Sequence, residues 1–108
     1  MFKRSILVIA ALVLVLGVAS VSLGAPAFKI GVVTGTVSQG EDEYRGAEFV
    51  DAKYPGMIEH RTYPDNFMAE QETYIAQITS LAADPAIKAI VVNQGVPGTV
   101  DAIRKVKQ

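Results

Sequence analysis

The chain has 108 residues, of which half are hydrophobic, and it contains no cysteine. This length allows one small domain, and the lack of cysteine excludes a disulfide framework. The sequence after residue 27 has eight basic and eleven acidic residues, which give a net charge of about −3. It contains no basic cluster, so we expect no nucleic-acid partner.

Residues 1–27 have the pattern of a signal peptide. Lys3 and Arg4 precede an uncharged apolar run that closes on Ala25-Pro26-Ala27, a small-x-small cleavage site. We expect cleavage after Ala27, because a cut after Ala25 would place Pro26 next to the bond. An uncleaved anchor is the alternative, since the apolar run approaches the about 20 residues that span a bilayer. No cysteine is available for lipid attachment, so the expected product is periplasmic or extracellular and is not a lipoprotein.

The first half of the exported part predicts two strands and a helix. Residues 28–34, FKIGVVT, are apolar on both faces, as in a strand buried within a parallel sheet. Residues 41–53 predict a helix with an apolar stripe of Ala47, Val50 and Tyr54, widened by Phe49. Residues 57–63, MIEHRTY, alternate and are more polar, which is typical of a strand near the edge of a sheet.

The second half repeats the helix–strand order. A helix is predicted over 67–83 after the turn Pro64-Asp65-Asn66, a strand over 87–93, and a helix over 99–107. The order β-α-β-α-β-α predicts an α/β fold with three αβα layers and a parallel sheet. Three strands bury little apolar surface, so we expect residues 28–108 to be an incomplete N-terminal lobe of a longer protein.

Ligands of open α/β sheets bind beyond the carboxyl ends of the strands. Three loops form that rim here, over 35–40, 64–66 and 94–98. The hydroxyl and amide groups that dominate there suit a small polar ligand, and the polar rim residues are Thr36, Ser38, Gln39, Asp65, Asn66, Asn93 and Gln94. The alternative is that such residues cap helices and shape turns, which we favour for Asp65 and Asn66 because a helix follows them directly.

The segment GTVSQGED, which begins at Gly35, has the glycine spacing of a phosphate-binding P-loop. Glu41 and Asp42 stand where that motif needs Lys and Ser/Thr, and Glu43 adds a third carboxylate. Acids at the start of a helix offset its dipole but repel a phosphate. A flavodoxin-like flavin or phosphate site remains the alternative, through Thr34-Gly35-Thr36.

Groups suited to catalysis are scarce. His60 is the only histidine and lies within a predicted strand, where a packed or surface role is more common than general base catalysis. No cysteine or second histidine is available for a metal site. We therefore expect no enzymatic activity, no catalytic residue, no metal and no cofactor.

Two segments carry a family resemblance. GEDEYRGAEF, within FKIGVVTGTVSQGEDEYRGAEF, and KAIVVNQGVPGT, within DPAIKAIVVNQGVPGT, resemble the start of type I periplasmic binding proteins, in an uncharacterised bacterial branch. The resemblance covers residues 28–108. It implies an exported protein that traps a small polar solute between two α/β lobes for a membrane transporter or sensor. It also implies that Thr36, Ser38, Gln39 and Gln94 face the cleft, although the second lobe and hinge are missing from this sequence.

Overall fold

The computed structural model describes residues 26–108. Its elements are β1 (Lys29–Thr34), α2 (Glu41–Lys53), β2 (Ile58–Thr62), α3 (Gln71–Ala83), β3 (Ile87–Val92) and α4 (Thr99–Val106). The predicted order of strands and helices is confirmed. Residues 1–25 of the predicted signal peptide lie outside the described part, so cleavage and export stay predictions. Among residues 26–108, no helix is both long and apolar enough to cross a bilayer.

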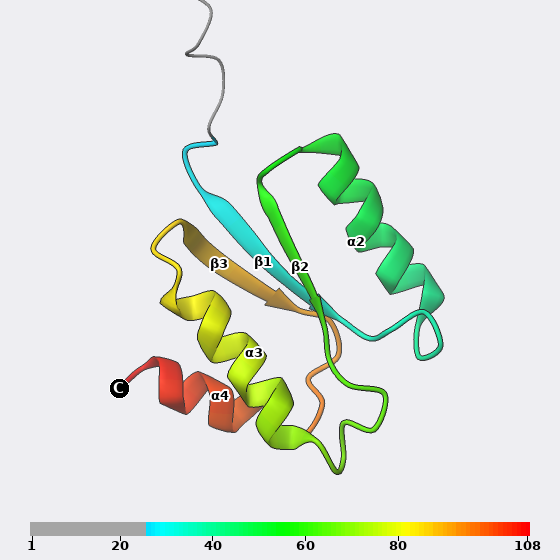
Figure 1. Cartoon of the computed structure of the whole chain (residues 1–108), viewed down its shortest axis with the longest axis vertical. Coiled ribbons are helices and arrows are strands. Elements are labelled where there is room, and N and C mark those ends of the chain that lie inside the picture. The colour runs from blue at the N-terminus through cyan, green and yellow to red at the C-terminus, as the bar shows by residue number, and fades with distance from the viewer. Residues whose placement is uncertain (1–25) are drawn as a thin grey trace, which may run out of the picture.

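The three strands form a parallel sheet in the order β2-β1-β3. Parallel neighbours need a crossover, and each crossover here is a helix. Helix α2 covers one face of the sheet, while α3, with α4 packed beside it, lies on the other (Figure 1). The predicted αβα layers and the edge position of β2 are therefore confirmed, and the carboxyl ends of all three strands meet at one end of the sheet.

The main core lies between the sheet and the α3–α4 layer. Side chains alternate along β1, so Gly31 and Val33 face this layer, and Val33 is fully buried. Buried residues from each neighbouring element complete the cluster: Tyr63, Tyr74, Ile75, Ile78, Leu81 and Ala102. Full burial of one aliphatic side chain contributes about 1.5–3 kcal/mol, so this layer contributes most of the hydrophobic stabilisation.

Tyr74 joins α3 to α4 from within this core. Its hydroxyl lies 2.7 Å from Thr99 Oγ1, and the Thr99 hydroxyl donates to the Val96 carbonyl at 2.7 Å. The chain of hydrogen bonds satisfies a fully buried phenol, which would otherwise carry an uncompensated desolvation cost. Burial raises the pKa of Tyr74 above its usual value. The hydroxyl is therefore a donor under ordinary conditions.

Two predictions from the sequence are wrong in detail. Helix α3 begins at Gln71, not at residue 67, because the Asn66 carbonyl accepts from the N–H groups of Ala69 and Glu70 and closes a separate turn. The apolar stripe predicted for α2 buries only Ala47; Phe49 is 69% exposed. Helix α2 therefore contacts the sheet over a narrow area, because Ala47, the residue that it buries there, is small.

Gly98, directly before α4, offers a test of how this layer is packed. Its φ is +100°, and a Cβ there would lie 3.3 Å from Tyr74 Cδ1 and 3.4 Å from Ile75 Cγ1. We expect Gly98→Ala to lower the free energy of unfolding by about 1–3 kcal/mol, because alanine is strained at positive φ. Gly46→Ala is the matched control: nothing lies within 4 Å of that exposed helical position, and the change should stabilise by about 0.5–1 kcal/mol. Chemical denaturation measures both, and equal shifts would contradict the account.

Candidate functional site

Tyr63 is the residue around which the three rim loops converge. It follows β2, its backbone N–H donates to the Thr34 carbonyl at 3.0 Å, and its side chain is 3% exposed. The Tyr63 hydroxyl donates to Gln94 Oε1 at 3.4 Å, which connects the second loop to the third. Gly35, in the first loop, lies directly beside this hydroxyl, because a Cβ there would come within 2.9 Å of it. The close approach of the loops thus depends on a glycine.

Asp65 ties the first loop to the second. Its Oδ1 accepts hydrogen bonds from the hydroxyls of Thr36 and Ser38, the latter at 3.1 Å, and the two hydroxyl oxygens are 2.9 Å apart. Asp65 does not cap α3; the residue at the N-cap position is Glu70, and no side chain caps that end. The capping interpretation of Asp65 is therefore wrong, because its carboxylate lies closer to donors in a loop 27–29 residues earlier.

Gln39 reinforces the same junction with its amide. Its Nε2 donates to the carbonyl of Asp65 at 2.8 Å and, more weakly, to that of Pro64 at 3.4 Å. The loop that carries it is tight, because the Thr36 carbonyl accepts from the N–H groups of Gln39 and Gly40, both at 3.0 Å. Three of the four predicted site residues, Thr36, Ser38 and Gln39, are thus brought together on Asp65.

Gln94 lies apart from this group. It is exposed, has a φ of +56°, and contacts the rest of the rim through the Tyr63 hydroxyl. Positive φ is uncommon for a residue other than glycine and is concentrated at functional or strained sites. Its backbone carbonyl accepts from the Val96 N–H at 2.8 Å, and of its side-chain atoms only Oε1 is hydrogen-bonded within residues 26–108, which leaves the NH₂ group as a donor.

Negative charge dominates the surroundings of the rim. Glu41, Asp42 and Glu43 form the first turn of α2, whose N-cap is Gly40, as expected from the sequence. Arg45 pairs within the helix, with Glu48 at 2.7 Å and Glu41 at 3.6 Å, and these exposed pairs leave the acidic turn largely uncompensated. The rim loops, residues 35–40, 64–66 and 94–98, contain no Lys or Arg.

His60 lies on the α2 face of β2 and is not part of a rim loop. Its Nε2 lies 2.8 Å from Thr34 Oγ1, and its ring lies 5.1 Å from that of Tyr44. Because the Thr34 hydroxyl donates to the Gly35 carbonyl, its oxygen accepts from Nε2–H of His60. Desolvation lowers the pKa of His60 below its ordinary value, despite the opposing charges of Glu48 and Asp51. The arrangement is that of a packed histidine.

Aromatic packing accounts for two further side chains. Phe67 lies edge-on to Tyr63 with ring centroids 5.6 Å apart, and Tyr63 in turn lies 5.9 Å from Tyr74. Phe67 is therefore engaged with the core, and Tyr44 is engaged with His60. Among residues 26–108, no three His, Cys, Asp or Glu side chains lie close enough to hold a metal ion.

The sequence missed Tyr63 as a rim residue. The available signal was its position: it ends the alternating segment 57–63 and precedes Pro64, so its side chain had to lie at the carboxyl end of the strand. It alternates onto the same face of the strand as the charged Glu59 and Arg61, a pattern that does not indicate burial. The burial of Tyr63 follows from α3 and Phe67, which pack over that end of the sheet.

The environment of His60 leads to a prediction about pH. Because folding lowers its pKa, the unfolded chain binds more protons below about pH 6.5, and unfolding is favoured as the pH falls. We expect His60→Gln, whose amide can still donate to Thr34, to lose less stability than the native chain between pH 7.5 and pH 5.5. Thermal melting of both proteins across this range measures the difference. Parallel pH profiles would show that His60 is not desolvated in the fold.

Two known proteins resemble this chain over 74% of its residues. One is an uncharacterised protein from Treponema pallidum (strain Nichols), which is 33% identical over 87 residues. The match covers 39% of the length of that protein. The other is a protein from Clostridium difficile 630 that has been proposed to be a transcriptional regulator and whose crystal structure is known. It is 31% identical to this chain, its structure matches with a TM-score of 0.69, and the match covers 25% of its chain. The chain thus spans less than half the length of either relative.

The family match covers the same region as the fold described above. Residues 28–108 include all three strands, all three helices and the whole rim. Over these residues the chain belongs to the family described as "Protein of unknown function (DUF3798)".

Proposed function

We propose that the chain carries one lobe of an exported protein that binds a small, neutral, polar solute. The observation that supports this most is the convergence of three loops, distant in sequence, at the carboxyl end of the parallel sheet. Thr36, Ser38 and Gln39 of the first loop are hydrogen-bonded to Asp65 of the second, and the Tyr63 hydroxyl connects the second loop to Gln94 of the third. Ligands of open α/β sheets bind at this end.

The chemistry of these groups favours a ligand that both donates and accepts hydrogen bonds. Asp65 Oδ1 accepts hydrogen bonds from the hydroxyls of Thr36 and Ser38. Each hydroxyl can rotate to donate to a ligand oxygen or nitrogen instead, at little steric cost. Amides such as Gln94 present a donor and an acceptor together. Sugars, polyols and small amides have this pattern, and each binds by many hydrogen bonds of modest strength.

Charge argues against an anionic ligand. A phosphate or carboxylate at the rim would face Asp65 and the three acids that open α2, with no Lys or Arg in the rim loops to neutralise it. The same argument weighs against the flavodoxin-like alternative, whose cofactor carries a phosphate. It also weighs against nucleic acid as a partner of this lobe, since Arg45, Arg61, Arg104 and Lys105 each lie beside an acidic side chain.

The proposed mechanism is closure of two lobes on the solute, as the resemblance to periplasmic binding proteins implies. The second lobe would come from the part of longer family members that this chain does not cover, since the chain matches 39% of the T. pallidum relative. A transporter or a sensor would read the closed state. The regulatory role proposed for the C. difficile protein supports sensing in particular.

Thr36 provides a direct test of the proposed site. The protein is produced in a bacterial host that exports it, and neutral sugars, polyols and amides are screened one at a time. We expect a solute that binds to raise the melting temperature of the protein. For a solute that binds, Thr36→Val should weaken the affinity by about tenfold, or about 1.4 kcal/mol, because a hydroxyl is lost. Isothermal titration calorimetry measures this change.

Thr79→Val is the control, because Thr79 is half-buried on α3, outside the rim, and its hydroxyl bonds only the Ala76 carbonyl. Equal weakening by both changes would place the solute elsewhere. Flavin absorbance in the purified protein, or binding of inorganic phosphate in place of neutral solutes, would instead support the flavodoxin-like alternative.

A further inference from the structure

His60 contacts both ends of the first rim loop, residues 35–40, although it lies outside that loop. It pairs with Val32 of β1 in the sheet, and its Nε2 lies 2.8 Å from Oγ1 of Thr34, the residue directly before the loop. Its ring lies 5.1 Å from the ring of Tyr44, in the first turn of α2 directly after the loop. One side chain thus connects the two ends of the loop that carries three of the proposed binding residues.

At the start of the loop, a hydroxyl transmits this contact. Thr34 is 2% exposed, its hydroxyl donates to the Gly35 carbonyl at 2.8 Å, and its oxygen accepts from Nε2–H of His60. A buried hydroxyl has few partners, so the two hydrogen bonds fix one another. The Gly35 carbonyl belongs to the same peptide group as the Thr36 N–H. The orientation of the first peptide of the loop therefore depends on the donor that His60 supplies.

At the end of the loop, the backbone transmits the contact. The Tyr44 N–H donates to the Gly40 carbonyl at 3.1 Å, and the Gly40 N–H donates to the Thr36 carbonyl at 3.0 Å. Because Ala47 is the one buried residue of α2, few contacts position this helix on the sheet. The ring pair of Tyr44 and His60 is one of them, so His60 also holds the end of the loop in place.

We propose that His60 is the positioning residue of the first rim loop, and that its neutral form holds the loop in the arrangement that binds a solute. The proposal rests on the solute site proposed above, and His60 acts through Thr34 and Tyr44 without touching the solute. A proton added at Nδ1 places a positive charge in a partly buried position, which is unfavourable. The charged ring turns toward water and releases Thr34, so the solute binds more weakly as the pH falls.

The groups that face His60 agree with this direction. Three titratable side chains face it, all on α2: Tyr44, Glu48 and Asp51. The residues of β1 and β2 on this face carry no charge. Glu48 is paired with Arg45 at 2.7 Å, which weakens its attraction for a protonated ring. Desolvation outweighs both carboxylates and lowers the pKa of His60, so the folded arrangement favours the neutral ring and is lost as the pH falls through that pKa.

NMR of the protein without solute tests the positioning role even if no solute is found. His60 is the only histidine in the sequence, so in protein purified without a histidine tag its ring signal reports its protonation between pH 7.5 and pH 5.5. The amide signals of residues 35–40 should shift with the same midpoint as the ring, while those of residues 94–98 should not. His60→Gln, whose amide can still donate to Thr34, should abolish this titration. A loop that does not follow the ring, or that titrates equally in His60→Gln, would overturn the proposal.

Thr34→Val separates the hydrogen-bonded connection from a direct effect of charge. The variant keeps the His60 ring but loses the hydroxyl, and circular dichroism establishes that it is folded. The pH-dependent shifts of Gly35 and Thr36 should become smaller, because their peptide group is no longer held through Thr34. Shifts of undiminished size would mean that the charge of His60 acts through space, and would contradict the positioning role.

Solute affinity as a function of pH tests the consequence for binding. For a solute that raises the melting temperature, calorimetry of the native protein should give an affinity at least about threefold weaker at pH 5.5 than at pH 7.5, because less of the loop is in the binding arrangement. His60→Gln should bind equally at both values. If Thr36→Val weakens binding but the native affinity does not change with pH, the solute site stands and the role of His60 is refuted. If the loop follows His60 but Thr36→Val has no effect on binding, the positioning role stands and the solute site is refuted.

Discussion

The central position of β1 in a parallel sheet is the constraint on which the rest of this structure depends. Because parallel neighbours require helical crossovers, β1 receives α2 on one face and the α3–α4 layer on the other. Its residues divide accordingly: Gly31 and Val33 face the α3–α4 core, while Thr34 faces His60 on the α2 side. The same arrangement directs the loops after all three strands to one end, where the polar rim forms.

The rim is held together by the side chains that are proposed to bind a ligand. Asp65 accepts from Thr36 and Ser38, and Gln39 donates to the backbone carbonyl of Asp65, so hydrogen bonds within the protein cross-link the first two loops. Such preorganisation lowers the entropic cost of binding. It also means that a solute has to exchange hydrogen bonds with the network, which favours a ligand that matches its donors and acceptors.

The sequence predicted the architecture well, because hydrophobic periodicity is a local signal. Five of the six elements were placed within about a residue of their observed bounds, whereas α3 began late because the backbone of Asn66 closes its own turn. The role of Asp65 could not be predicted, since it depends on two loops that only the strand order brings together. The exposure of Val91 could not be predicted either. Residues 87–92 are nearly all apolar, but their burial depends on a neighbouring element that the described sheet does not supply.

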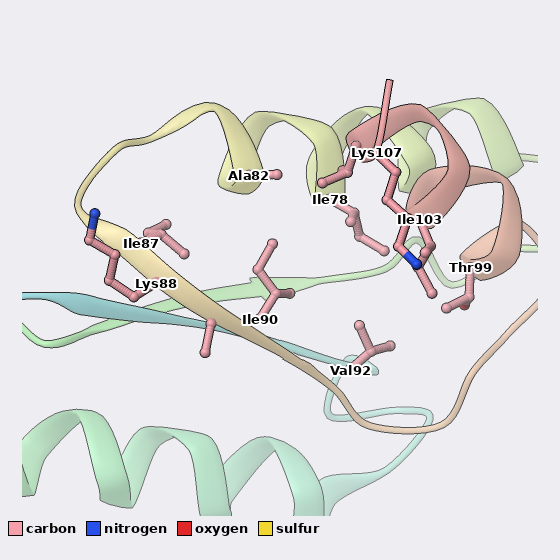
Figure 2. A pocket seen from close by; sticks show the side chains of 11 residues that line it. Ile78, Ala82, Ile87, Lys88, Ile90, Val92, Thr99, Ile103 and Lys107 are labelled. Carbon is pink, nitrogen blue, oxygen red and sulfur yellow. The ribbon is translucent and has the colours of Figure 1, made fainter.

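We propose that a solute binds at the polar rim around Tyr63 rather than in the apolar groove of about 380 Å³ that α3, β3 and α4 line (Figure 2). Backbone NMR shifts of the protein, titrated with a solute that raises its melting temperature, test this most directly. We expect shifts confined to Tyr63 and the rim loops, residues 35–40, 64–66 and 94–98, while the signals of Ala82 and Ile103 stay unchanged. Shifts centred on Ala82 and Ile103, with a silent rim, would contradict it.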